Sequence, residues 1–437
     1  MNEDFRFHLG WLGGLEGDPF EQSTFAEISL VAADETITAL EDSLAHSVRQ
    51  GVRGPAYDLA LWFVENWWRL RWEPESHSVD WRLSHVLAAV GGGVAWPNVC
   101  FASDGLHVLV QARSTLLGKG APVRYLHNGE TYIRAASFEA GTFDFVQTVL
   151  ARLSSLAVGE SDLSSLWSQL LTDREEPSRE ANRRMEALLG FDLDEAPSEL
   201  VSQLLSDTEA AGAGAVQEVA AAAKVHALDV LKDVIGRARS SSIRIKVQPP
   251  HYRLSQRDAS SSDLPWQRAE SAARTARQAW SIPQGPVSDA KLSDVLSVNP
   301  SVFEATAQSR FSLSAGLRSN HGTSEVSVAM KSRWNAGRRF EMMRIVADYL
   351  GSSDRLLPIT SARTDRQKFQ RAFAQEFLLP FDELKERFGL GQLEEHDIGI
   401  DDIEEVASEY RVSPLLVSTL LVNKGVLARS ALPAAPD

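Results

Sequence analysis

The segments RRFEMMRIVADYL, residues 338–350, and QRAFAQEFLLP, residues 370–380, decide the fold of the C-terminal part of the chain. Both combine strong helix formers with apolar residues every three or four positions, the spacing of an amphipathic helix. Before them, SEVSVAM, residues 324–330, alternates apolar and polar side chains and predicts a strand. Working outward, we predict helices at 337–350, 366–378, 381–388, 401–409 and 413–423.

Upstream, QRAESAARTARQAW, residues 267–280, predicts an amphipathic helix followed by the turn residues SIPQGPVSD. Ser288 or Asp289 could cap the next helix, AKLSDVLSV. This order of helix, Gly-Pro turn, helix, strand and Arg-Phe helix resembles the ImmA/IrrE family of metallopeptidases. The resemblance covers about 265–425 and is carried by GRRFEMMRIVADYLG, RAFAQEFLLP and ASEYRVSPLLVSTLL.

The resemblance implies a zinc site. An active member carries His-Glu-x-x-His after the Arg-Phe pair and a further carboxylate before the Phe-Ala of the second segment. Histidines at i and i+4 lie on one helix face and hold the metal, and the glutamate activates the metal-bound water. The aligned positions here are Arg344, Ile345, Asp348 and Gln367. Arginine only donates hydrogen bonds and isoleucine cannot move a proton, so a degenerate site with no metal, cofactor or catalytic residue is implied.

Two hypotheses describe Arg344 and Asp348 in such a site. They carry opposite charges four residues apart, so they could form a salt bridge across the former metal cavity. Alternatively, they are unrelated surface residues of an ordinary helix. Nearby, TSARTDRQKFQRAF, residues 360–373, is rich in basic residues, and we interpret it as a solvated helix face rather than a docking face.

Other candidate ligands are few. His321 lies just before the predicted strand and could face the cavity, although a turn residue is the favoured interpretation. His77, Asp80 and His85 are close in sequence and could form a metal or acid–base group, but solvated and capping residues are favoured. Cys100 lies in a strand-like run and is expected to be a buried thiol rather than a nucleophile.

Residues 1–172 mix helix and strand signals and predict an α+β domain with antiparallel strands. GPAYDLALWFVENWWRLRWEP, residues 54–74, predicts a helix that ends before Pro74. VCFASDGLHVLVQARS predicts a hairpin around the turn at 103–105, and VRYLHNGETYIRAAS predicts another around Asn128-Gly129. FDFVQTVLARLSSL then predicts a helix.

Six of the eleven tryptophans lie between positions 62 and 96, interleaved with arginines. This pattern could stack on nucleic-acid bases or bind a peptide. We favour an aromatic core covered by arginine stems, because one helix cannot expose so many rings without aggregating. The candidate interaction residues are Trp62, Trp67, Trp68, Arg69, Arg71 and Trp72.

The fold class predicted from these patterns is α+β, with three structured parts. Residues 1–172 form the N-terminal domain, and residues 173–240 form a helical segment. The Ser- and Pro-rich stretch 241–265 is a linker with at most one short strand. Residues 266–425 form a mostly helical, zincin-like domain, and residues 426–437 are a disordered tail.

The composition is that of an ordinary globular chain of 437 residues, 43% hydrophobic and 24% charged. We find no signal-peptide pattern and no apolar stretch of about 18 residues, so no membrane contact is expected. The single cysteine excludes an internal disulfide and fits a cytoplasmic location. The net charge of −15 argues against a general nucleic-acid-binding surface.

Three functional hypotheses follow. The first is a non-catalytic, ImmA/IrrE-like bacterial protein that binds a protein partner; the resemblance implies a link to phage or mobile-element, stress or toxin–antitoxin control. The second is a metal-dependent peptidase or other hydrolase, with a rebuilt metal site or activity in the N-terminal domain. The third is a nucleic-acid-linked regulator that uses the Trp- and Arg-rich region.

Overall fold

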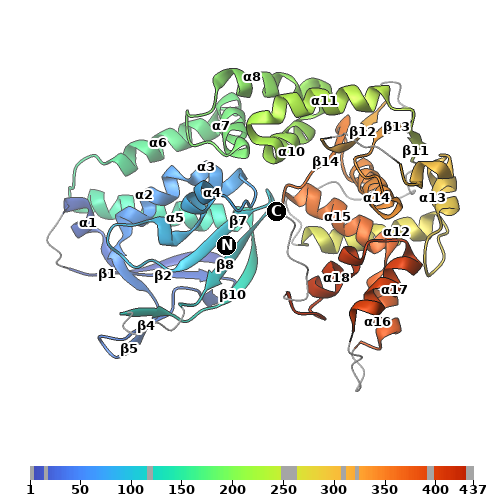
Figure 1. Cartoon of the computed structure of the whole chain (residues 1–437). Helices are drawn as coiled ribbons and strands as arrows, with labels where there is room; N and C mark the ends of the chain where they lie inside the picture. The colour runs from blue at the N-terminus through green and yellow to red at the C-terminus, as the bar shows by residue number, and fades with distance from the viewer. Residues whose placement is uncertain are drawn as a thin grey trace. The chain divides into compact units, whose positions relative to one another are not determined.

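The computed structural model describes residues 4–13, 18–115, 122–247, 263–306, 312–319, 324–390 and 398–429. The fold is α+β, as predicted, with 54% helix and 17% strand (Figure 1). Among the described helices, none combines the length and apolar character that a bilayer crossing requires. The chain divides into two compact units, residues 1–205 with 362–364, and residues 206–361 with 365–437.

Antiparallel sheets organise the first unit. One sheet contains β1 (Phe5–Trp11), β2 (Phe25–Ala32), β3 (Glu35–Thr36) and β6 (Val52–Pro55). A second contains β4 (Leu40–Asp42), β5 (Ser47–Arg49) and β9 (Val123–Tyr125). A third contains β7 (Asn98–Ser103), β8 (His107–Arg113) and β10 (Gly129–Arg134).

The helices of this unit pack on one another and on these strands. They are α1 (Pro19–Ser23), α2 (Ala56–Glu65), α3 (Trp67–Trp72), α4 (Val79–His85), α5 (Ala135–Ser155), α6 (Asp162–Glu175), α7 (Pro177–Leu189) and α8 (Ser198–Ser206), the last of which reaches the boundary between the units. Helix α2 contacts β2, α5 and α6, and α5 contacts β1.

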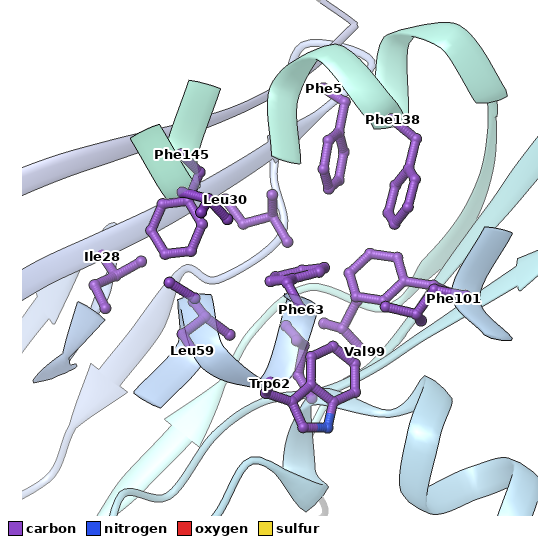
Figure 2. Close-up of a cluster of buried hydrophobic side chains, with 14 of the residues drawn as sticks. Phe5, Ile28, Leu30, Leu59, Trp62, Phe63, Val99, Phe101, Phe138 and Phe145 are labelled. Atoms are coloured by element: carbon purple, nitrogen blue, oxygen red, sulfur yellow. The ribbon is translucent and has the colours of Figure 1, made fainter. Parts of the chain in front are cut away.

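Aromatic side chains fill the core between these layers (Figure 2). The Phe63 ring of α2 lies 5.7 Å from the ring of Phe101 on β7 and 6.3 Å from the rings of Phe138 and Phe145 on α5. Phe5 of β1 is 5.1 Å from Phe138. Because rings from strands and helices meet around Phe63, this cluster joins elements that are distant in sequence.

Two local predictions for this unit need correction. The hairpin around the turn at 103–105 is confirmed by β7 and β8, but the hairpin around Asn128-Gly129 is wrong. Strand β9 pairs with β4, and β10 pairs with β8, so β9 and β10 lie in different sheets.

The helix predicted to end before Pro74 is interrupted at Asn66, whose side chain donates to the Trp62 carbonyl at 2.8 Å. Tertiary pairing and a side-chain bond override the local signals.

The second unit is built on the antiparallel sheet β11-β13-β12-β14. Its strands are β11 (Arg244–Lys246), β12 (Ser314–Arg318), β13 (Glu325–Ala329) and β14 (Leu356–Ile359). Its helices are α9 (Thr208–Ala211), α10 (Ala213–Ala223), α11 (Ala227–Ser240), α12 (Pro265–Ala279), α13 (Asp289–Leu296), α14 (Asn335–Gly351), α15 (Asp365–Leu378), α16 (Phe381–Phe388), α17 (Ile400–Tyr410) and α18 (Pro414–Asn423).

The helices predicted for the C-terminal part are confirmed by α12 to α18, and Ser288 caps α13 by accepting from Lys291 N at 3.2 Å. Strand β13 confirms the predicted strand. Strands β12 and β14 were not anticipated; β14 carries Pro358 and holds only four residues, a weak pattern for a strand.

The domain boundaries differ from those expected. The division lies between residues 205 and 206 rather than in the stretch 241–265, because α10 packs on β14 and α11 packs on β12 and β13. Strand β11, inside the predicted linker, pairs with β13 and so belongs to the second unit's sheet. The rest of the predicted linker, 248–262, and the tail from 430 lie outside the described residues.

A glycine allows β1 to approach α5 closely. A Cβ added to Gly141 would lie 2.2 Å from the Phe5 backbone oxygen, which cannot rotate away. We therefore expect Gly141→Ala to lower the free energy of unfolding of the first unit by about 1–3 kcal/mol. Tryptophan fluorescence during urea unfolding measures this, because eight of the eleven tryptophans lie between positions 11 and 167.

The matched control for that change is Gly236→Ala in α11, where nothing lies within 4 Å of the added Cβ. Helix propensity alone should then stabilise the second unit by up to about 1 kcal/mol. Equal stability changes for the two variants would contradict the close approach of β1 to α5.

Candidate functional site

The residues at the resemblance's zinc positions lie in the contact between two helices of the second unit. Helix α14 carries Arg344, Ile345 and Asp348, and α15, which packs against it, carries Gln367. All four side chains are buried. The chain places them together because α14 is followed by the short strand β14, which returns the chain to the start of α15 beside α14.

Arg344 and Gln367 are directly bonded. The Arg344 Nη2 donates to Gln367 Oε1 at 2.7 Å and to the Thr360 carbonyl at 2.9 Å. The same Gln367 oxygen accepts from Thr360 N at 2.9 Å, and its Nε2 donates to the Pro358 carbonyl at 3.1 Å. The positions that the resemblance assigns to the first histidine and to the third ligand therefore hold a hydrogen-bonded pair.

The predicted salt bridge between Arg344 and Asp348 is wrong. Asp348 instead pairs with Arg366, whose Nε donates to Oδ1 at 2.7 Å and whose Nη2 donates to Oδ2 at 2.6 Å. Arg366 Nη1 also donates to Asp354 Oδ2 at 2.5 Å. The planar guanidinium of Arg366 donates to both carboxylate oxygens of Asp348 at once. Arg344, one turn earlier on the same helix as Asp348, makes no such bidentate contact. The alternative of a surface pair is also wrong, since both residues are buried.

Arg366 is the residue of this cluster that sequence reasoning missed. It was assigned to a solvated basic face, yet its side chain is only 3% exposed. A usable signal was its place next to Gln367, as the second residue of a helix that packs on α14. Burial by itself lowers the pKa of Arg366, but the carboxylates of Asp348, Glu218 and Asp354 together raise it above its ordinary value.

Arg344 is a buried cation with a different environment. Burial, reinforced by the charge of Arg371, lowers the pKa of Arg344 to about 9, which leaves it protonated at neutral pH. Its Nε is buried and has no hydrogen-bond partner. Its other contacts are neutral oxygens rather than a carboxylate. Such a group contributes less to stability than the bidentate pair beside it.

Ile345, at the position of the general base, makes an apolar contact with β12. A Cβ added to Gly316 would lie 2.8 Å from Ile345 Cγ2 and 2.8 Å from Val326 Cγ1. The glycine therefore leaves just enough space for the isoleucine. At the position that the resemblance assigns to the general base, the space is therefore filled by hydrocarbon.

These donors do not fit zinc. Arg344 has no lone pair to offer, and both oxygens of Asp348 are engaged by Arg366. The Gln367 oxygen already accepts two hydrogen bonds. A catalytic zinc needs about three protein ligands and an open position, and this cluster supplies neither. His321 lies outside the described residues.

The Trp- and Arg-rich region is part of the first unit's core. Trp62, Trp67, Trp68 and Arg69 are buried, so the proposed interaction residues cannot stack on a base or a peptide. Arg69 donates to Glu73 at 2.8 Å and to Asp192 at 2.8 Å.

The two remaining residues of that candidate set are partly buried. The guanidinium groups of Arg71 and Arg184 lie 4.0 and 3.6 Å from the centroid of the Trp72 ring. Arg71 also donates to Glu139 at 2.6 Å. The favoured interpretation of the sequence pattern, an aromatic core covered by arginine stems, is the arrangement observed.

The other candidate ligands do not converge. His85 is fully buried, with ring nitrogens 2.7 Å from the Trp81 carbonyl and 3.1 Å from the Arg69 carbonyl, whereas His77 and Asp80 are exposed. Burial lowers the pKa of His85 to about 4, which favours its neutral form. Burial also raises the pKa of the Cys100 thiol to about 12, so it is not a thiolate nucleophile.

The first unit contains a cavity of about 350 Å³ between its first two sheets. Its charged lining residues are Glu21, Arg49 and Arg53; Arg49 donates to Asp42 at 2.7 Å and Arg53 to Glu27 at 3.2 Å. Among the described residues that line this cavity, none is a histidine, a cysteine or a residue with a hydroxyl side chain that could act as a nucleophile. The remaining lining is Phe25, Leu40, Val52, Pro55, Gly92, Gly93, Val94, Ala95 and Val123.

The Asp58 carboxyl lies next to Gly92, one of the two glycines that line this cavity. The Asp58 Oδ2 is buried without a hydrogen-bond partner, and a Cβ on Gly92, whose φ is +65°, would lie 2.3 Å from it. Burial, helped by the charges of Glu21 and Asp18, raises the pKa of Asp58 to about 6. This group is the clearest titratable outlier of the first unit near neutral pH.

Comparisons of the chain with protein-family models, curated proteins and solved structures find no match. The resemblance to ImmA/IrrE proteins therefore rests on the quoted sequence segments alone.

The two arginines of the cluster should respond differently to mutation. Asp348→Ala leaves Arg366 without its bidentate partner and should cost about 3–5 kcal/mol of unfolding free energy. Arg344→Met removes a buried cation that has no carboxylate partner and should cost clearly less. Circular dichroism during urea unfolding measures both changes.

Double-mutant cycles then assign the coupling. Combining Asp348→Ala with Arg366→Met should cost much less than the sum of the single changes, whereas Asp348→Ala and Arg344→Met should be additive within about 0.5 kcal/mol. The exposed Asp382→Ala is the matched control, with an expected cost of about 0.5 kcal/mol or less. Strong coupling between positions 344 and 348 would refute the observed pairing.

Asp58 predicts a pH dependence. Its folded pKa of about 6 exceeds the unfolded value of about 3.9, so the folded state binds more protons between these values. The contribution of Asp58 to stability is therefore fully present below about pH 4 and is lost as the pH rises through 6. Asp58→Asn should stabilise the first unit at pH 7.5 relative to wild type, with little difference near pH 4. Equal effects at both pH values in fluorescence-monitored unfolding would contradict this.

Proposed function

We propose that this chain is a non-catalytic, ImmA/IrrE-like regulatory protein that acts by binding a protein partner. The observation that carries the proposal is the 2.7 Å contact between Arg344 and Gln367, which lie on different helices. The resemblance assigns these two positions to the same metal ion. Their meeting in space is expected if α14 and α15 occupy the places of a zinc-binding helix pair.

The chemistry of the cluster supports a binding role over a catalytic one. In place of ligands and a base, the helix contact contains a hydrogen-bond network around Arg344 and Gln367, a bidentate ion pair and an isoleucine packed on Gly316. Each group has a packing or bonding role within the helix contact. A metal-dependent hydrolase therefore has less support, and a regulator that reads nucleic acid through Trp67 and Trp68 has less still, because those rings are buried.

The setting of the proposed function follows from the resemblance. Active relatives of the family are associated with the removal of repressors in mobile elements, with stress responses and with toxin–antitoxin loci. A chain that keeps the helix framework without the chemistry could bind the same class of regulatory protein without cutting it. On this proposal the protein works in the bacterial cytoplasm.

Metal content tests the non-catalytic part of the proposal. After exposure to excess zinc and dialysis, the wild-type protein should hold far less than one zinc per chain, because the available oxygens are engaged and Arg344 cannot ligate. Elemental analysis of the dialysed protein gives the answer. About one tightly held zinc per chain, together with chelator-sensitive peptidase activity, would overturn the proposal.

A rebuilt site tests the correspondence of positions. Asp348→His alone would leave the buried Arg366 guanidinium without its bidentate carboxylate partner. The variant therefore combines Arg344→His, Asp348→His and Gln367→Glu with Arg366→Met. We expect this variant to take up zinc, while a control that keeps Gln367 should bind it more weakly. If the rebuilt protein folds, as judged by circular dichroism, yet takes up no zinc, positions 344, 348 and 367 do not correspond to the metal ligands of the peptidase site.

A further inference from the structure

Trp334 is the one exposed tryptophan among the eleven of this chain, all of which lie in described residues. It is 68% exposed, whereas the others are buried or partly buried. Exposure of a large ring to water is unfavourable, and a single tryptophan offers more binding area than any other side chain. Its position, immediately before α14, places it at the start of the helix that carries the degenerate site.

The segment that presents this ring, residues 331–334, is held by hydrogen bonds at each step; we call it the Trp334 loop. Lys331 N donates to Ser314 Oγ at 2.8 Å, and Ser332 N donates to both oxygens of Glu341, at 3.1 and 3.0 Å. The Arg333 carbonyl accepts from Thr306 N at 2.9 Å.

The far end of the loop is equally fixed. The Trp334 carbonyl accepts from Arg338 N at 2.9 Å, and a Cβ on Gly337 would lie 2.0 Å from Ser332 Oγ, so the first turn of α14 packs tightly on the loop. A ring held on such a fixed backbone loses little conformational entropy when it binds, which favours affinity.

Two cations of the Trp334 loop precede the ring in sequence. Lys331 and Arg333 are exposed, and no carboxylate of the described residues lies within salt-bridge distance of either. The Arg333 guanidinium lies 5.7 Å from the centre of the Trp334 ring. A tryptophan with adjacent arginine is the composition found at the energetic centre of protein interfaces.

We propose that the Trp334 loop is the docking surface for a protein partner that presents an apolar pocket edged with carboxylates. Trp334 would enter the pocket, and Lys331 and Arg333 would pair with its rim. This inference deepens the proposed binding function and rests on it, because it names the surface through which binding would occur.

Charge decides between a protein and a nucleic acid as the occupant. Two cations and an aromatic ring could also bind single-stranded nucleic acid. However, the chain carries a net charge of −15, which repels a long polyanion. A local pair of cations on an acidic protein complements a short acidic patch of limited extent. An acidic and apolar protein surface therefore fits better than a nucleic acid.

Displayed random peptides selected on the full-length protein provide the probe. We expect enrichment of peptides that combine acidic residues with apolar or aromatic ones, and Trp334→Ala should weaken their binding about tenfold or more. Leu415→Ala is the matched control, because Leu415 is another exposed apolar side chain of the same unit, 55% exposed, and its loss should leave binding unchanged. Trp334→Ala should not change the unfolding midpoint, since the ring is exposed.

A second variant tests the two cations separately from the Trp334 ring. Reversing both charges, with Lys331→Glu and Arg333→Glu, should abolish binding of the acidic peptides while the ring stays in place. Binding by wild type should also weaken as salt increases. Retention of peptide binding by both the Trp334→Ala and the charge-reversed proteins would overturn the proposal.

Three further outcomes are decisive. If no peptides bind the wild-type protein more strongly than they bind the Trp334→Ala variant, the proposed docking surface is overturned. Binding of oligo(dT) that Trp334→Ala removes overturns the protein partner and assigns the loop to nucleic acid. Metal content and peptidase activity are measured on the same preparations. A protein that holds zinc, has chelator-sensitive peptidase activity and still binds peptide through Trp334 refutes the non-catalytic function alone. A zinc-free protein without this peptide binding refutes only the docking surface.

Discussion

The second unit depends on the bidentate pair between Arg366 and Asp348, which joins α15 to α14 inside the protein. A buried guanidinium is tolerated only when its donors are satisfied, and here Asp348, Asp354 and the Leu356 carbonyl accept from it. These acceptors come from α14, from the turn that follows it and from β14. Satisfying one arginine therefore fixes three consecutive parts of the chain relative to one another.

Around this pair, the remaining positions of the cluster follow from the requirement that buried polar groups find partners. Gln367 bonds both the Thr360 backbone and Arg344, and in doing so connects the end of β14 to both helices. Ile345 needs no polar partner and packs where Gly316 leaves room. In the proposed pseudo-enzyme, this hydrogen-bond network would hold α14 and α15 together where a metal ion would do so through its ligands.

The first unit is organised differently, by apolar packing. Phe63 meets rings from β7 and α5, and the tryptophans of α2 and α3 extend this core instead of facing solvent. Arginines cover the rings with their planar groups while carboxylates satisfy their charges, as at Arg69. The contrast with Trp334 is informative, because it is the exposed one among the tryptophans, all of which lie in described residues, and the exposed Arg333 lies 5.7 Å from its ring centre.

The sequence by itself determined the α+β class, the positions of α12 to α18 and the impossibility of zinc ligation by Arg344, because helical periodicity and side-chain chemistry are local properties. It also favoured a core role for the tryptophans. Only the tertiary structure decided which residue pairs with Asp348, which sheets receive β9 and β10, and that α10 and α11 belong with the second unit. Those outcomes depend on contacts between segments that are far apart in sequence. Geometry and the need to satisfy buried charges determine which residues and strands pair, and a local sequence pattern contains neither kind of information.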